Sequence, residues 1–316
     1  MLAKCMCVTL LVALPVLAQT SAGLLERIQH APLTPAERQA LTTAWSQKEF
    51  DRMEAVLIGA ARTAQPKDHA AALCALLGAL EFLDTRMKQA VQGFRQADAL
   101  SPLDDSDRFT LAMALIELGD DKAARAELTR LYESHPKQPV YLYWLARLDY
   151  GQRLFEQASE KFKRVVGLDP SSARGYDNLG LTYDMLGRNE EALTAFAKAT
   201  DLNRKLSKPS PWPPDNMGYF QFRQQQYDAA EANLREALKY DPKFGPAHYH
   251  LGRVLEIKNL NDEAIEEYKA AAALDSKLAE PLYSLGVLYR KRGQDAESGA
   301  ALDEYRKRKA LSGDPR

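Results

Sequence analysis

The chain has 316 residues and a formal net charge of −1, so charge gives no reason to expect nucleic acid or an anionic membrane as the main partner. Length alone allows one or two globular domains. A repeated pattern fills nearly the whole chain, however, and leaves no block of about 100 residues for a separate catalytic domain. Ala, Leu, Glu, Lys and Arg recur at helical spacing, which predicts an almost entirely α-helical protein.

Residues 1–18 differ from the rest of the sequence. Lys4 precedes an apolar run that ends in small residues at Ala18. This order is typical of a secretory signal peptide, which we expect to be cut after Ala18 or, as the alternative, after Ala22. The other interpretation is an uncleaved anchor, but a run of about 11 apolar residues is short against the roughly 20 that a spanning helix needs. We therefore expect an exported protein, periplasmic or extracellular, without a transmembrane segment after cleavage.

The next two segments precede the regular part of the chain. Residues 19–33 are expected to be a flexible lead-in. Thr34 to Glu37 is a favourable helix start with Pro35 in the first turn. From there a degenerate helical hairpin is predicted over about 34–70, and atypical terminal repeats are expected because an end repeat has only one neighbour.

The segment 173–206 carries the clearest pattern. Four residues fall at i, i+3, i+4 and i+7, and so lie on one face of a first helix: Tyr176, Leu179, Gly180 and Tyr183. Leu186-Gly187-Arg188 interrupts that helix, and Ala192 and Phe196 continue the apolar face on a second helix. The segment therefore predicts two helices that cross closely at small residues.

The same pattern recurs every 34 residues in three independent positions. The glycine position reads Gly78, Ala112, Ala146, Gly180 and then, after a short insertion, Gly218, Gly252 and Gly286. The alanine position reads Ala90, Ala124, Ala158, Ala192, Ala230, Ala264 and Ser298. The large apolar position reads Phe94, Leu128, Phe162, Phe196, Leu234, Tyr268 and Leu302. The repeats are predicted at 71–104, 105–138, 139–172, 173–206, 211–244, 245–278 and 279–312, with a tail at 313–316.

Two places depart from the period. The insertion 207–210 lies in a proline-rich stretch that we expect to be extended and stiff, with Asp215 capping the next helix. Trp212 either packs back on the repeats or is offered to a partner. The last repeat ends in the basic run Arg306 to Lys309, which either caps the helix and complements its dipole or contacts an anionic surface.

This pattern resembles the tetratricopeptide repeat, in which an aromatic residue, Leu-Gly, Tyr, Ala and a second aromatic residue follow at fixed spacing. The resemblance implies an all-α, right-handed α-solenoid of stacked helix-turn-helix repeats. Some similar proteins hold acidic C-terminal peptides in a clamp of Lys and Asn residues. Asn178 and Asn216 are present here but the paired lysines are absent, so that type of recognition is not expected.

In proteins that resemble this family, a second stripe on each first helix lines a concave groove for a peptide or a partner helix. It consists of the residues three before, one after and four after the glycine position, and we call it the inner stripe. Aromatic and Arg residues on this stripe are the usual anchors of binding sites. The expected groove residues are Phe109, Met113, Tyr143, Arg147, Tyr150, Tyr219, Phe222, Tyr249, Arg253 and Tyr283. The alternative is that these residues serve the scaffold alone.

No catalytic residue, metal site or cofactor is predicted. After signal cleavage Cys74 is the single cysteine, and its place in the repeat predicts a small core side chain rather than a reactive thiol. His248 and His250 point about 200° apart on a helix, so both cannot easily bind one metal. Carboxylates are expected on exposed helical faces, and no phosphate-binding loop or nucleophile elbow is present.

We therefore expect a non-enzymatic protein–protein interaction module of the cell envelope, an adaptor or assembly scaffold that binds a partner peptide or helix. Two alternatives remain: a structural scaffold that self-associates through its end repeats, and an accessory docking subunit of an envelope enzyme complex. No nucleic acid partner is expected.

Overall fold

The computed structural model describes residues 21–311, and the all-α fold predicted from the sequence is confirmed. Seventeen α-helices and no strand occur in this range. The predicted signal segment 1–18 and the tail 313–316 lie outside it. The chain divides into two compact units, residues 1–153 and 154–316, each described by itself below.

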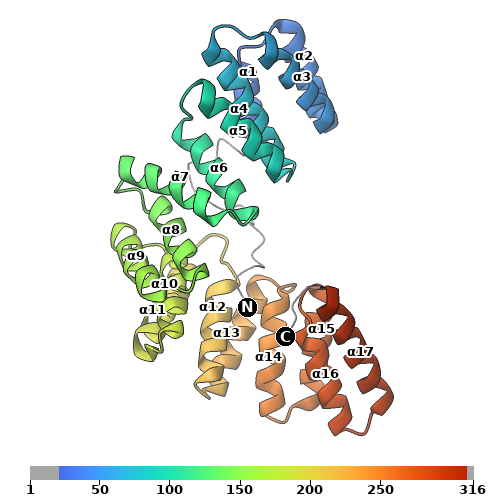
Figure 1. Ribbon diagram of the computed structural model, residues 1–316. Coiled ribbons are helices and arrows are strands. Elements are labelled where there is room, and N and C mark those ends of the chain that lie inside the picture. The colour runs from blue at the N-terminus through green and yellow to red at the C-terminus, as the bar shows by residue number, and fades with distance from the viewer. Residues whose placement is uncertain (1–20, 312–316) are drawn as a thin grey trace. The chain divides into compact units, whose positions relative to one another are not determined.

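The N-terminal unit consists of helices that follow one another in hairpins (Figure 1). Its helices are α1 (Ser21–His30), α2 (Pro35–Gln47), α3 (Phe50–Thr63), α4 (Lys67–Leu83), α5 (Met87–Leu100), α6 (Asp105–Glu117), α7 (Asp121–Ser134) and α8 (Pro139–Gly151).

The C-terminal unit has the same construction (Figure 1). Its helices are α9 (Phe155–Leu168), α10 (Ala173–Met185), α11 (Asn189–Asn203), α12 (Trp212–Arg223), α13 (Tyr227–Tyr240), α14 (Gly245–Ile257), α15 (Asn261–Leu274), α16 (Glu280–Lys291) and α17 (Asp295–Leu311). Of its first helices, α12 contacts both α10 and α14. We call the faces of the first helices that carry the inner-stripe residues the inner side.

Each hairpin closes around the repeated small and large residues. A Cβ added at Gly180 would lie 2.7 Å from Cδ1 of Phe196, so only glycine lets α10 approach the ring of α11 this closely. Phe196 and Ala192 are fully buried at this contact. The same residue types are buried in the other repeats, among them Phe94, Phe162 and Tyr268. Burial of such side chains stabilises each hairpin, at roughly 1.5–3 kcal/mol for a fully buried apolar side chain.

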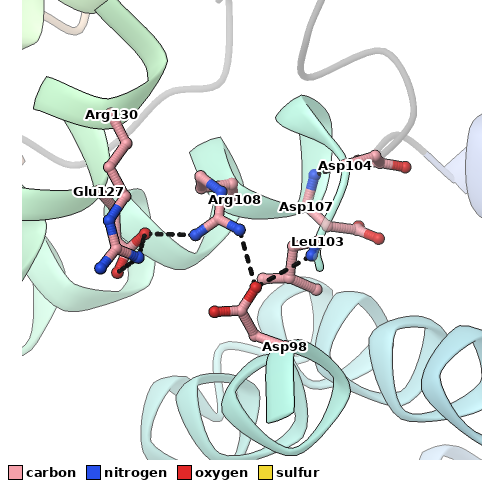
Figure 2. Close-up of polar contacts among 7 residues, drawn as sticks. All are labelled: Asp98, Leu103, Asp104, Asp107, Arg108, Glu127 and Arg130. Atoms are coloured by element: carbon pink, nitrogen blue, oxygen red, sulfur yellow. Dashed lines mark hydrogen bonds and ion pairs between the residues drawn. The ribbon is translucent and has the colours of Figure 1, made fainter. Parts of the chain in front are cut away.

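Arg108 of α6 joins neighbouring hairpins of the N-terminal unit (Figure 2). Its guanidinium donates to Asp98 of α5 at 2.7 Å and to Glu127 of α7 at 2.7 Å. Asp98 also accepts from the backbone N–H of Leu103 at 3.0 Å. Burial alone would raise the pKa of Asp98, but these hydrogen bonds outweigh it and lower the pKa. Asp98 therefore holds the loop between α5 and α6 through Leu103 and the start of α6 through Arg108.

The expectation of a flexible lead-in over 19–33 is wrong for α1. Leu24 and Ile28, four residues apart, are fully buried, and α1 packs against α2 and α4. Arg38 of α2 donates to the carbonyl oxygens of Ile28 at 2.8 Å and Ala31 at 2.9 Å, where α1 ends. These contacts stabilise a helix that is too short to be stable alone in water.

The proline-rich stretch also differs from expectation, because α12 begins at Trp212 and includes Pro213 and Pro214. Proline is tolerated there because the N–H groups of a first helical turn have no partner within the helix. Asp215 lies inside this turn and is not its cap. Trp212 packs back on the unit, edge-on against Phe244 with ring centroids 4.7 Å apart.

Cys74 behaves as its place in the repeat indicated, and the basic run contacts a neighbouring helix. Cys74 is buried and free, and burial raises the pKa of its thiol. In the basic run, Arg308 donates to the carbonyl oxygens of Ala272 at 2.9 Å and Asp275 at 3.4 Å. Arg308 thus covers the C-terminal end of the neighbouring helix α15, a role that neither interpretation of the basic run included.

Candidate functional site

Four of the expected groove residues meet on the inner side of the C-terminal unit. The guanidinium carbon of Arg253 lies 4.5 Å from the ring centroid of Phe222 and 5.8 Å from those of Tyr219 and Tyr249. All four side chains are half-buried. They come from the neighbouring helices α12 and α14, so stacking of the repeats brings them together. We call these four residues the Arg253 cluster.

Arg253 is held by aromatic rings rather than by a carboxylate. Among the described residues its guanidinium makes no hydrogen bond and no ion pair, although it can donate five. Contacts of this kind with ring faces fix the orientation of a cation. The cluster therefore holds the unused N–H donors of Arg253 in place among aromatic rings. These donors can bind a carboxylate that has an apolar group beside it.

Beneath the cluster, Tyr219 is stacked on His250, with ring centroids 4.4 Å apart and an interplanar angle of 18°. His250 Nδ1 lies 2.9 Å from Oδ1 of Asp215, whose side chain is almost fully buried. The carboxylate of Asp215 thereby fixes the imidazole, and the imidazole supports the Tyr219 ring. Arg223 also lies over Tyr219, 5.4 Å from its centroid, and pairs with Asp184.

A second buried carboxylate lies on the same side. Asn216 Nδ2 donates to both oxygens of Asp177, at 3.1 and 2.9 Å. Burial raises the pKa of Asp177 to about 7, the bond from Asn216 opposes this, and the nearby Asp215 adds to it. The prediction that carboxylates lie on exposed faces is therefore wrong for Asp177 and Asp215, because partners on the next repeat compensate for their burial.

Polar contacts between neighbouring first helices follow one rule that was not predicted from the sequence. In each pair, a residue on the first helix of one repeat contacts a residue on the first helix of the next repeat. The second residue lies one position after the one that is equivalent to the first. The pairs are Asp177 with Asn216, Asp184 with Arg223, Asp215 with His250 and Glu256 with Lys291. The separations of 39 and 35 residues equal one repeat plus one residue, the first including the insertion. Complementary polar residues at these offsets are a signal that the sequence already contained.

The remaining groove residues have other surroundings. In the N-terminal unit Phe109 is fully buried, with its ring centroid 5.7 Å from that of Tyr141, so it belongs to the core rather than to a surface. Met113 and Tyr143 are also buried. Arg147 lies over the ring of Trp144 at 5.2 Å. Tyr150 of the N-terminal unit is half-buried, and the exposed Tyr283 of the C-terminal unit packs beside Tyr305.

The described residues contain no set of three or more His, Cys, Asp or Glu side chains placed to hold a metal ion. Within the same range, no helix combines the length and apolar character required to cross a bilayer.

Comparison with known proteins agrees with the repeat pattern. The family model described as "Tetratricopeptide repeat" matches residues 109–173, 143–206 and 217–279, about half of the chain. The BBSome complex member BBS4 of Bos taurus is 26% identical over 176 residues, which are 55% of this chain and 33% of that protein. The Hsp70-Hsp90 organizing protein 1 of Glycine max is 29% identical over 128 residues, 40% of this chain and 22% of that protein. The chain thus spans a third or less of the length of these two relatives.

A solved tetratricopeptide repeat protein from Parabacteroides merdae superposes with a TM-score of 0.63 at 14% identity and covers 88% of this chain and 99% of its own. This likeness concerns the fold. Proteins built from these repeats act as protein–protein interaction scaffolds. With half of its residues matched by the repeat model and its helices paired as the repeat requires, the chain belongs to the tetratricopeptide repeat family.

Proposed function

We propose that this protein is a non-enzymatic adaptor of the cell envelope that binds a partner peptide or helix on the inner side of its C-terminal unit. The observation that carries the proposal is the Arg253 cluster: a guanidinium fixed among three aromatic rings with no acceptor of its own in the described chain. Aromatic and Arg residues of this kind dominate the energetics of protein interfaces.

The supporting contacts are already in place before any partner binds. His250 fixes Tyr219 from below, and Asp215 fixes His250. Little side-chain entropy is therefore lost on binding, which favours affinity. The chemistry that fits is a segment with a carboxylate directed at Arg253 and an apolar side chain on the exposed faces of Phe222 and Tyr249.

A site-specific photo-crosslinker tests where the partner binds. Tyr283 is 53% exposed on α16 of the inner side, and Leu193 is 37% exposed on the second helix α11. We expect a crosslinker at position 283 to capture a partner in the native cell and one at position 193 to capture none. Capture only from position 193 would contradict the proposal, and capture of a second copy of this chain would instead support the self-associating scaffold.

The envelope location rests on the signal-like residues 1–18 and is tested separately. We expect the mature protein to begin at Gln19 and to fractionate with the envelope or the medium. An uncut chain in the cytoplasm would overturn the location without affecting the binding side.

A further inference from the structure

Helix α1 occupies the inner side of the N-terminal unit in the way a bound helix would. It lies beside α4 in Figure 1 and contacts it. Arg27 and His30 of α1 line the same cavity as Ala71, Ala75 and Leu76 of α4. Ala75 stands three residues before Gly78, the inner-stripe position that holds Tyr249 in α14. The face of α4 that would belong to an open inner side is therefore covered by the chain itself.

Three side chains of α1 take part in its attachment to the N-terminal unit. Leu24 and Ile28 are fully buried and lie on one face of the helix. Arg27, between them, forms a two-pronged ion pair with Asp107 of α6: Nη1 to Oδ1 at 2.7 Å and Nη2 to Oδ2 at 2.9 Å. The side chain of Asp107 is only 5% exposed, so loss of Arg27 would remove an ion pair from a buried carboxylate.

The end of α1 is also held by hydrogen bonds from Arg38 of α2, but the helix itself is short. The helix has ten residues, below the length of about 12–15 at which isolated helices become marginally stable in water. A cavity of about 380 Å³ remains beside it, lined by Arg27, Asp68, Asp104 and Asp107 among others. Because α1 does not fill the face it covers, a helix with bulkier side chains would bury more apolar surface there.

We propose that the inner side of α4 and α6 is a docking site for a short amphipathic helix of a partner protein, and that α1 fills this site until the partner displaces it. The partner helix carries two aliphatic residues four positions apart and a cation directly before the second, the pattern of Leu24, Arg27 and Ile28. This site lies in the N-terminal unit, so it does not depend on the binding side proposed for the C-terminal unit.

The test uses the full chain and a fluorescent peptide of residues 19–33 as the probe. We expect wild-type protein to bind the peptide about 100-fold more weakly than the variant Leu24→Asp/Ile28→Asp, because the attached α1 competes at high effective concentration. Adding Asp107→Asn to that variant should weaken peptide binding at least about tenfold, as should Arg27→Glu in the peptide. The matched peptide Glu26→Gln changes an exposed side chain and should bind as the unmodified peptide does.

Circular dichroism of the variants establishes that they are folded. A folded Leu24→Asp/Ile28→Asp protein that does not bind the peptide would overturn the proposal.

A second measurement needs no variant: in wild-type protein the amides of α1 should exchange with solvent faster than those of α4. Equal protection of the two helices would show that α1 is not displaceable. If wild-type protein forms a dimer and Ile28→Asp dissociates it, the helix that occupies the site is α1 of a second copy and not a helix of a partner protein.

Discussion

Asn216 holds the buried carboxylate of Asp177 by donating to both of its oxygens, at 3.1 and 2.9 Å. No cation supplies a direct ion pair to this carboxylate among the described residues, and burial raises its pKa to about 7. The ordinary value is 3.8. The free energy of unfolding therefore depends on whether Asp177 is protonated.

The sign of the pH dependence follows from that difference. Between about pH 4 and pH 7 the folded state binds the Asp177 proton and the unfolded state releases it, so the free energy of unfolding falls as the pH rises. We expect Asp177→Asn to remove this component. Relative to wild type, the variant should be more stable at about pH 8 than at about pH 4, by a few kcal/mol since one pKa unit corresponds to about 1.4 kcal/mol.

Urea unfolding at the two pH values measures this difference. As a companion variant, Asn216→Ala removes the bonds that oppose the shift and should raise the pKa of Asp177 further. Parallel pH profiles for Asp177→Asn and wild type would contradict a buried carboxylate that has no ion pair.

The contact between Gly180 and Phe196 gives a second prediction. A Cβ at position 180 would meet Cδ1 of Phe196 at 2.7 Å, so Gly180→Ala should destabilise the protein by about 1–3 kcal/mol through overpacking. Phe196→Ala should cost about 3–5 kcal/mol by leaving a cavity. The matched control is Gly167→Ala on the exposed side of α9, where a Cβ meets nothing within 4 Å.

That control should be neutral or stabilising by about 0.5–1 kcal/mol, because alanine is the better helix former. Denaturant midpoints compare the three variants. If Gly180→Ala proved as harmless as Gly167→Ala, the close crossing of α10 and α11 would be wrong.

Cys74 gives a third prediction. The thiol is buried and burial raises its pKa, so little thiolate is available at neutral pH. We expect a thiol reagent to label the folded protein much more slowly than the protein unfolded in denaturant. Labelling at the same rate in both states would show that Cys74 is accessible, and would return the reactive-thiol interpretation.

The periodic part of the fold could be predicted because three positions repeat the same residue types over seven copies. The spacing placed Gly180 against Phe196 without any structural information. The start of α12 was harder to predict: prolines at 213 and 214 normally indicate extended chain, but a first helical turn accepts them.

Helix α1 could not be predicted from local pattern, because its stability comes from distant contacts. Its two buried aliphatic residues are a weak signal, and the carboxylate that binds Arg27 lies 80 residues away. The candidate site was predicted in part. The residue types around Arg253 were identified, but aromatic residues at the same repeat positions serve the core in the N-terminal unit, as Phe109 does. The spacing of aromatic residues alone does not distinguish a core position from a position in a binding site.

The most direct test of the proposed adaptor is an in-cell crosslinking pull-down with three full-length proteins: wild type, Arg253→Glu and Arg95→Glu. Arg95 is an exposed residue of α5 and controls for the charge reversal itself. The account predicts that a partner captured by wild type and by Arg95→Glu is lost with Arg253→Glu, while the helical circular dichroism signal is the same for all three. Identical partners for all three proteins would contradict the assignment of the binding side to the Arg253 cluster.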